Sequence, residues 1–421
     1  MAVFRPFRAI RPRPELAGQV AALPYDTMNS AEARQRAQGN PLSFLHIDKA
    51  EIDLPEGTGV YEDTVYETAA ANLRRWRDDG IFAQDDQPQF YIYRQTWRGR
   101  TQTGLVGCAA IDDYRSGVIR KHELTHPDKE ADRIRHVTAC NANTGPIFLM
   151  YRDGQAVARM LDDWCDTHAC ECSFEAAQAD NALQEIWPIT DDALAEALQN
   201  AFAAMESLYI ADGHHRTASA YNVGRAKRAR HPGYTGEEEF NFFLAVAFPE
   251  DQLSILDYNR VVRDLNGLGG TAFLSRLDAL FDVAYYAPAG TPYRPESTHY
   301  FGMFLDGRWY KLRARRGSYD ARDPVACLDV EILQKNLLAP VLGIRDPRRD
   351  HRVEFIGGIR GPEELERRCR PDANDMRVAF LMFPTTTGEL MAIADSGNIM
   401  PPKSTWFEPK LLSGLFIHEL E

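Results

Sequence analysis

The stretch that most constrains this chain is residues 207–221, Ser-Leu-Tyr-Ile-Ala-Asp-Gly-His-His-Arg-Thr-Ala-Ser-Ala-Tyr. Residues 208–211 form a short apolar run with the length of a buried strand. Asp212-Gly213 interrupts that run, and a helical pattern opens at Thr217. A strand–glycine–helix junction leaves backbone N–H groups unbonded and directs the positive end of the helix dipole at one spot. The stretch therefore predicts an anion-binding site, and phosphate is the usual anion.

Five consecutive polar or flexible residues, Asp212 to Arg216, add chemistry to this junction. Neighbouring helical residues lie about 100° apart, so His214 and His215 are not placed to chelate one ion together. We interpret Gly213 as allowing close backbone approach and Arg216 as gripping phosphate oxygens, with Asp212 and one histidine available for proton or magnesium chemistry. The alternative is an aspartate N-cap followed by solvated histidines.

Length and charge limit the classes of function. A chain of 421 residues is long enough for two or three domains. Its net charge of -13 argues against general nucleic-acid binding, although a local basic patch for a small anion stays open. No apolar run reaches the roughly 18–20 residues of a membrane helix, and the first residues lack the apolar core of a signal peptide. We therefore expect a cytoplasmic protein without nucleic-acid or membrane partners.

Strands and helices alternate without the regular period of parallel strand–helix–strand units, which favours a mixed α/β, α+β-like architecture. The main predicted strands are 42–47, 89–97, 104–112, 147–151, 208–211 and 240–248, with 253–256 as the partner of the last. The main predicted helices are 61–79, 127–136, 155–168 and 191–205.

Three regions are expected along the chain. Residues 1–205 form an N-terminal α/β region that carries His122-Glu123. Residues 206–265 form a central strand–turn–helix region that binds phosphate and packs on the first. Residues 266–421 form a C-terminal α/β region that carries the Lys403-Ser404-Thr405 loop.

A second polar group surrounds the start of the predicted helix at 127. Glu123, just before it, is a candidate general base, as is His122. Along the helix, Lys129 and Arg133 share one face with Asp132 and His136. That face could bind the phosphates of a nucleotide, or it could be a solvated, salt-bridged surface.

A third polar group is the loop Lys403-Ser404-Thr405, which follows two prolines that stiffen the backbone. These side chains would suit a phosphate or carboxylate clamp, although no Walker glycines precede them. The alternative is a rigid turn whose aromatic neighbours simply pack.

Four potential metal ligands, Cys165, His168, Cys170 and Cys172, also cluster, but their spacing matches no usual zinc pattern. Reduced thiols near a helix-to-strand connection are the preferred interpretation.

Five motifs in this order resemble the prokaryotic family catalogued as domain of unknown function 1015. They are Tyr25-Asp26 after proline, His122-Glu123-x-Thr125 with Lys129 and Asp132-Arg133, Asn143-x-x-Pro146-Ile147-Phe148, Ala211–Arg216, and Met400-Pro401-Pro402-Lys403-Ser404-Thr405. The resemblance spans nearly the whole chain.

The segment Asp212-Gly213-His214-His215-Arg216 is also similar to a motif of the ParB/sulfiredoxin-like superfamily, whose archaeal free-serine kinases carry the same string. In those relatives the segment binds nucleotide phosphates beside the reacting group. The resemblance implies a ParB/sulfiredoxin-like nucleotide-binding core elaborated by further sheets and helices.

Together these patterns lead to the hypothesis of a kinase that transfers phosphate from ATP or ADP, with Mg²⁺, to free serine or a close analogue. The expected catalytic residues are Glu123, His122, Asp212 and His215, with Asp212 also as the metal ligand. The expected nucleotide-binding residues are Gly213, His214, Arg216, Thr217, Lys129, Arg133, Asn143, Lys403, Ser404 and Thr405. Two alternatives remain: a ParB-like nucleotide-binding regulator without fast chemistry, and a phosphoserine-type phosphatase or other hydrolase.

Overall fold

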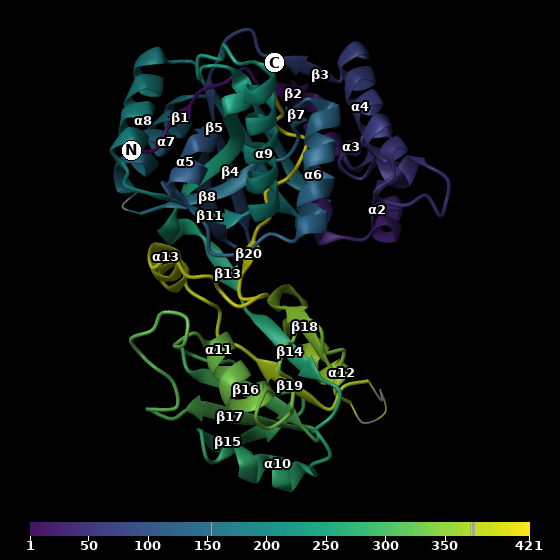
Figure 1. The fold of residues 1–421 in the computed structure, drawn as a ribbon, viewed down its shortest axis with the longest axis vertical. Coiled ribbons are helices and arrows are strands. Elements are labelled where there is room, and N and C mark those ends of the chain that lie inside the picture. The colour runs from purple at the N-terminus through teal and green to yellow at the C-terminus, as the bar shows by residue number, and fades with distance from the viewer. Residues whose placement is uncertain (153, 371, 373–374) are drawn as a thin grey trace. The chain divides into compact units, whose positions relative to one another are not determined.

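A computed structural model describes residues 1–152, 154–370, 372 and 375–421 (Figure 1). The chain forms two compact units, Met1–Leu253 with Pro409–Glu421, and Ser254–Glu408. These units divide the chain after Leu253 and after Glu408, whereas the sequence predicts boundaries after residues 205 and 265. With 36% helix and 26% strand in mixed parallel and antiparallel sheets, the structure confirms the mixed α/β class.

The first unit is built on a nine-stranded sheet with the order β6-β11-β8-β12-β5-β4-β10-β9, in which β1 also pairs with β5. Its strands are β1 Phe4–Arg5, β4 Phe90–Trp97, β5 Arg100–Ala110, β6 Ile119–Arg120, β8 Ile147–Tyr151, β9 Cys172–Ala176, β10 Ala182–Ile189, β11 Leu208–Asp212 and β12 Phe242–Pro249. Two short pairs accompany it: β2 Ile10–Pro12 with β3 Phe82–Gln84, and β7 Ala142–Asn143 with β21 His418–Glu419.

The sheet changes direction near β11. This strand runs parallel to β6 and antiparallel to β8, while β8 runs parallel to β12. Every residue of β8 and β12 is buried, which explains why both read as continuous apolar runs instead of alternating ones. Strand β11 thus lies one place in from the β6 edge of the sheet, beside the fully buried β8.

The helices of this unit pack against the sheet or against a second core beside it. They are α1 Ala17–Val20, α2 Ser30–Ala37, α3 Leu45–Asp48, α4 Asp63–Asp78, α5 Ile111–Ser116, α6 Pro127–Cys140, α7 Gln155–Thr167, α8 Asp192–Ala204 and α9 His214–Arg230. Apolar residues of α7 and α8, such as Leu161 and Phe202, share a core with alternate residues of the strands, such as Leu105 and Leu149. Helices α6 and α9 lie beside each other (Figure 1) and share a smaller core through Val137 and Val223.

A separate apolar core joins α2, α3 and α4 to β2 and β3. The sequence prediction of a strand at 42–47 is wrong, because this segment turns at Ser43 and enters α3. Phe44 packs edge-on against Trp76 of α4 and Phe82 of β3. Short apolar runs are ambiguous between strand and helix, and the packing of Phe44 decides this one.

The second unit contains an antiparallel sheet with the order β15-β17-β16-β19-β14-β18. Its strands are β14 Tyr258–Val262, β15 Phe281–Pro288, β16 Tyr300–Leu305, β17 Arg308–Ala314, β18 Val353–Gly357 and β19 Val378–Leu381; its helices are α10 Gly270–Leu277, α11 Asp329–Leu333, α12 Gly361–Arg368 and α13 Thr387–Asp395. A π-helical stretch, Gln334–Leu338, continues α11.

The remaining pair of strands in this unit is β13 Ser254–Leu256 with β20 Trp406–Glu408. The predicted pairing of 253–256 with 240–248 is therefore wrong. The apolar pattern identifies the strand, but its partner lies about 150 residues further along the chain, beyond the reach of local pattern reasoning.

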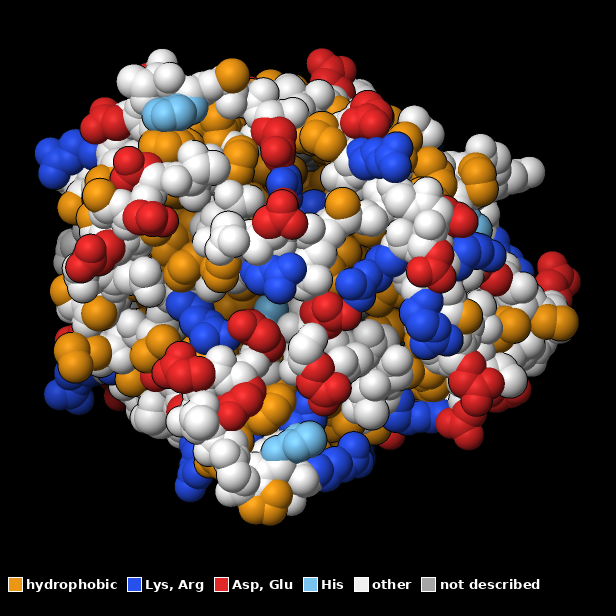
Figure 2. Space-filling view, turned by 90° about the horizontal axis from the view of Figure 1, so that it is seen from above, with side chains coloured by type: hydrophobic (Ala, Val, Ile, Leu, Met, Phe, Trp, Pro, Cys, Tyr) orange, Lys and Arg blue, Asp and Glu red, His pale blue; other side chains and the backbone are white. Residues whose placement is uncertain are grey.

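The segment Pro409–Glu421 returns to the first unit. Its buried Phe416 packs against Tyr91 and Tyr93 of β4, and β21 pairs with β7. Figure 2 shows acidic and basic side chains interspersed over the face drawn, without one extended field of a single sign. Within the described ranges, no helix is long and apolar enough to cross a membrane.

Candidate functional site

The centre of the candidate site is the junction between β11 and α9. Gly213 takes a φ of 96° and is the N-cap residue, so α9 begins at His214 and not at Thr217 as the sequence pattern predicts. The Thr217 amide is the first to reach a carbonyl within the turn, that of Gly213 at 2.9 Å, and the Thr217 hydroxyl bonds the same oxygen. No side chain caps the helix, so the alternative of an aspartate N-cap is wrong. The preceding N–H groups are those that a helix start offers to an anion.

Arg216 folds back over this junction. Its guanidinium donates to the Pro146 carbonyl and to the Asp212 carboxylate, the latter at 3.3 Å. It also lies against the backbone of Gly213, where a Cβ atom would come within 3.1 Å of Nε. That Nε is buried and has no hydrogen-bond partner among the described residues, so one guanidinium donor remains for a ligand.

Asp212 is anionic and held by cations. Burial alone would raise the pKa of its carboxyl, but Lys410 and Arg216 outweigh that effect and hold the pKa at about 2. The Lys410 ammonium lies 3.9 Å from the carboxylate. Because two cations already neutralise this carboxylate, Asp212 fits the role of orienting Arg216 better than that of a magnesium ligand. Sequence reasoning did not single out Lys410, since nothing local links it to Asp212.

His214 points toward the segment that precedes α6. Its ring packs edge-on against His122 with 4.5 Å between centroids, and its Nδ1 lies 3.9 Å from a carboxylate oxygen of Glu123. Burial lowers the pKa of His122 to about 4, with Asp212 opposing the effect, and burial together with His122 lowers the pKa of His214. Both imidazoles are therefore neutral near pH 7. The ligand atoms of His122, Glu123 and His214 lie within 4.8 Å of one another, so these three could hold a metal ion.

His215 faces the start of α6. Its Nε2 accepts a hydrogen bond from the backbone N–H of His126 at 2.9 Å. Burial, and then the nearby Lys129, lower the pKa of His215. The imidazole thus links the two helix starts. Because its Nε2 already accepts this hydrogen bond, Nε2 is not free to accept a proton in the catalytic role expected of His215.

A cavity of about 280 Å³ opens beside α6. The residues of the predicted α6 face, Lys129, Asp132, Arg133 and His136, all line it. Arg133 is buried, forms an ion pair with Asp132 at 2.8 Å and lies 3.9 Å above the Tyr25 ring. The cavity is therefore walled by fixed charges of both signs; its other lining residues include Asp26, Ser30, Asp48, Lys49, Glu51 and Tyr66.

A smaller cavity of about 20 Å³, room for about one water, adjoins the larger one. Tyr25, Asp48, Arg133 and His136 line both cavities, while Arg216 lines the smaller one. The large cavity thus continues toward the guanidinium at the junction. Asp48 went unnoticed in the sequence because it lies in the segment predicted to follow a strand.

Asn143 also lines the smaller cavity, but its carbonyl oxygen already serves the fold. It accepts from the Leu244 backbone at 3.4 Å and lies 3.2 Å from Nδ1 of His418. These contacts tie β7 to β12 and β21.

Lys403, Ser404 and Thr405 belong to the second unit. Lys403 has a φ of 58°, and its carbonyl accepts a hydrogen bond from Arg260 at 3.1 Å. The Ser404 hydroxyl donates to the Pro401 carbonyl, and the Ser404 carbonyl accepts from Thr385. This geometry describes a tight, internally bonded turn, and a joint phosphate site with residues of the first unit stays a prediction.

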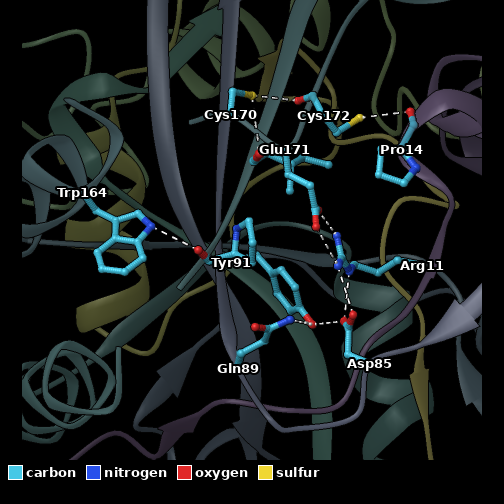
Figure 3. Close-up of polar contacts among 11 residues, drawn as sticks. Arg11, Pro14, Asp85, Gln89, Tyr91, Trp164, Cys170, Glu171 and Cys172 are labelled. Atoms are coloured by element: carbon cyan, nitrogen blue, oxygen red, sulfur yellow. Dashed lines mark hydrogen bonds and ion pairs between the residues drawn. The ribbon is translucent and has the colours of Figure 1, made fainter. Parts of the chain in front are cut away.

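The cysteine cluster has backbone partners (Figure 3). The Cys170 thiol donates to the Cys172 carbonyl at 3.0 Å, and the Cys172 thiol donates to the Pro14 carbonyl at 3.7 Å. Beside them, Arg11 bridges Asp85 and Glu171. Burial raises the pKa of both thiols, which suits reduced structural cysteines and not metal-binding thiolates.

Comparison with known protein families identifies the family of the chain. The family described as "Protein of unknown function (DUF1015)" matches residues 4–331. The chain belongs to this family. Membership in DUF1015 agrees with the resemblance drawn from the motifs and places the junction, the cavities and the His122–His214 pair inside the matched range.

No curated protein matches this DUF1015 chain. Among solved structures, a mutant free serine kinase in complex with AMP is 12% identical with a TM-score of 0.34, covering 73% of this chain and 91% of that one. SbnI with a C-terminal truncation, from Staphylococcus aureus, is 13% identical with a TM-score of 0.35, covering 73% and 85%. A conserved hypothetical protein from Pyrococcus furiosus is 11% identical with a TM-score of 0.32, covering 73% and 93%. At these TM-scores the ParB/sulfiredoxin-like core stays a prediction.

Proposed function

We propose that this protein transfers a phosphoryl group from a nucleotide, ATP or ADP, to the hydroxyl of a small metabolite, with free serine as the first acceptor to test. The observation that carries the proposal is the uncapped start of α9 at Gly213, with Arg216 folded over it. Arg216 lines the small cavity, which shares four lining residues with the cavity of about 280 Å³. Phosphoryl transfer needs positioning and charge neutralisation more than covalent chemistry, and this arrangement supplies both.

The phosphates of the nucleotide would lie against the N–H groups of residues 213–216 and the Arg216 guanidinium. Helix N–H groups and a buried guanidinium retain their orientation when the ligand arrives, so little reorganisation is needed. Lys129 and Arg133 supply further positive charge along the cavity wall. We place Mg²⁺, which the kinase hypothesis includes, with the nucleotide phosphates and not on Asp212, whose charge Arg216 and Lys410 already balance.

Glu123 is the preferred general base. It is the acidic member of the group beside His214, and its side chain is 46% exposed, so an acceptor hydroxyl can approach it. His122 is buried, so an acceptor hydroxyl has much less access to it. In the proposed step, Glu123 takes the hydroxyl proton, the hydroxyl oxygen bonds to the terminal phosphorus, and the bond from that phosphorus to the bridging oxygen breaks to release the shortened nucleotide.

The test is phosphoserine formation from serine with ATP and with ADP, followed by mass spectrometry. We expect Arg216→Ala to abolish turnover and to weaken ADP binding by about tenfold to hundredfold, because a charged hydrogen bond is worth about 1.5–3 kcal/mol. Arg230→Ala, an exposed position at the far end of α9, is the matched control. A fully active Arg216→Ala enzyme with an intact circular-dichroism spectrum would remove the central assignment.

The same experiment separates the alternatives. ADP binding that depends on Arg216 without any phosphoserine product favours a nucleotide-binding regulator. Release of phosphate from added phosphoserine favours a phosphatase that uses the same anion site.

A further inference from the structure

The contact between His122 and His214 has an unusual feature. Both side chains are buried, with exposed fractions of 2% and 6%. By strict geometry neither nitrogen of His122 nor Nε2 of His214 has a hydrogen-bond partner among the described residues, although the Ile210 backbone lies close enough to His122 to act on its pKa against the effect of burial. A buried polar group without a partner destabilises a fold by a few kcal/mol, so native proteins keep few such groups unless a ligand or ion completes them.

Glu123 turns this pair into a set of three. Its carboxylate lies 3.9 Å from Nδ1 of His214, and all three ligand atoms lie within 4.8 Å of one another. Ligand atoms around a tetrahedral zinc ion are about 3.3 Å apart, so small side-chain rotations would close the set around one ion. The two imidazoles form the buried side and the half-exposed carboxylate forms the side that faces solvent.

We propose that His122, Glu123 and His214 bind a divalent transition-metal ion such as Zn²⁺. Two imidazoles and one carboxylate favour zinc, iron or nickel over magnesium, which prefers oxygen ligands. Neutral imidazoles supply the lone pairs that the ion needs. The charges around the pair are mixed: Asp212, itself paired with Arg216 and Lys410, acts on both histidines, and Lys121 acts on His214 with the opposite sign.

The site is distinct from the phosphate cradle, although both share the start of α9. The cradle uses backbone N–H groups and the Arg216 guanidinium, while the metal ligands are the side chains of His122, Glu123 and His214. A carboxylate that ligates an ion is a weaker proton acceptor, because the ion draws on its lone pairs. Occupancy would therefore weaken the base proposed above, and added Zn²⁺ is expected to slow any turnover.

The binding test needs no nucleotide and no activity. Co²⁺, which reports its coordination by visible absorption, is titrated into the full chain after chelator treatment, and Zn²⁺ is then added to displace it. We expect one Co²⁺ per chain, displacement by Zn²⁺, and no displacement by an equal concentration of Mg²⁺.

Three variants identify the ligands. Glu123→Gln and His214→Asn should each weaken Co²⁺ binding at least about tenfold. Mutation of residues that merely hydrogen-bond to metal ligands already lowers metal affinity by that factor, and loss of a ligand should lower it at least as much. His126→Ala is the control, since His126 is an exposed histidine in the same segment. Glu123→Gln lies at the half-exposed position, so the fold should survive even where the buried histidine variant unfolds.

Two outcomes would overturn the proposal: absence of a Co²⁺ band in the folded chain, or a band that Glu123→Gln leaves unchanged. Both are independent of the phosphoryl-transfer proposal, which ADP titration of the metal-free chain tests separately.

Discussion

At the scale of single residues, Gly213 is the position within the candidate site where a side chain is strained by the backbone conformation. We expect Gly213→Ala to lower the free energy of unfolding by about 1–2 kcal/mol, because the residue must hold a left-handed φ of 96° and its Cβ would press on Arg216. ADP binding should weaken in parallel. Chemical denaturation and ADP titration check both effects. Gly233→Ala, where a Cβ meets nothing within 4 Å, is the control and should change neither.

The pair His46 and Asp53 predicts a pH dependence. Nδ1 of His46 lies 2.6 Å from the Asp53 carboxylate, which also accepts from Asn72, so α3 is tied to α4 beside the large cavity. The hydrogen bond to Asp53 raises the pKa of His46, and although burial acts the other way, the bond to His46 lowers the pKa of Asp53. The stabilisation is complete between about pH 4 and pH 6.5, and it is lost as pH rises through the raised pKa of His46.

We therefore expect the urea midpoint of the wild-type chain to fall more steeply between about pH 6 and about pH 9 than that of Asp53→Asn. Parallel midpoint curves for the two proteins would contradict this role of the pair.

At the scale of elements, the site depends on how α6 and α9 are joined. The Glu130 carboxylate accepts from Thr125 at 2.6 Å and from Asn222 at 2.8 Å, while its backbone carbonyl accepts from Ser219. Glu130→Ala should lower the free energy of unfolding by about 1–3 kcal/mol, because the side-chain hydrogen bonds to Thr125 and Asn222 are lost. ADP binding should also weaken, because α6, which lines the cavity, is then held less firmly against α9. Glu196→Ala, on the exposed face of α8, should do neither. Calorimetry with and without ADP measures both.

Local patterns predict much of the fold. Continuous apolar runs identify β8 and β12, and the amphipathic spacing of Val65, Ala69, Leu73 and Trp76 identifies α4. Local patterns do not predict structure that depends on contacts between residues distant in sequence. Helix α3 forms where Phe44 packs on Trp76 and Phe82, and β13 pairs with β20 near the end of the chain.

The same division applies to the site. The glycine turn before α9 is visible in the sequence, as is the shared face of Lys129 and Arg133. The contact between His122 and His214 is not, because these residues are far apart in sequence and meet only when the segment after β6 folds beside α9. The contact between Lys410 and Asp212 is likewise not predicted, because these residues are also far apart in sequence.

At the scale of the whole molecule, the first unit depends on the returning segment 409–421. Phe416 is fully buried between Tyr91 and Tyr93, with centroid separations of 5.1 and 6.1 Å. Phe416→Ala should destabilise the first unit by about 3–5 kcal/mol. Hydrogen exchange should quicken in β4 while β16 keeps its protection. Tyr285→Ala, an exposed ring in the second unit, is the control, and equal acceleration in both units would show that they do not unfold separately.

The return of residues 409–421 also sets the order of events during synthesis. While the ribosome is still translating the second unit, Tyr91 and Tyr93 lack their covering segment. The second unit is continuous in sequence and can close first, whereas the earlier-made sheet must wait for the last stretch to emerge. A ribosome that stalls before residue 409 would thus release a chain whose aromatic core around Tyr91 and Tyr93 is uncovered, a natural substrate for chaperones and proteases.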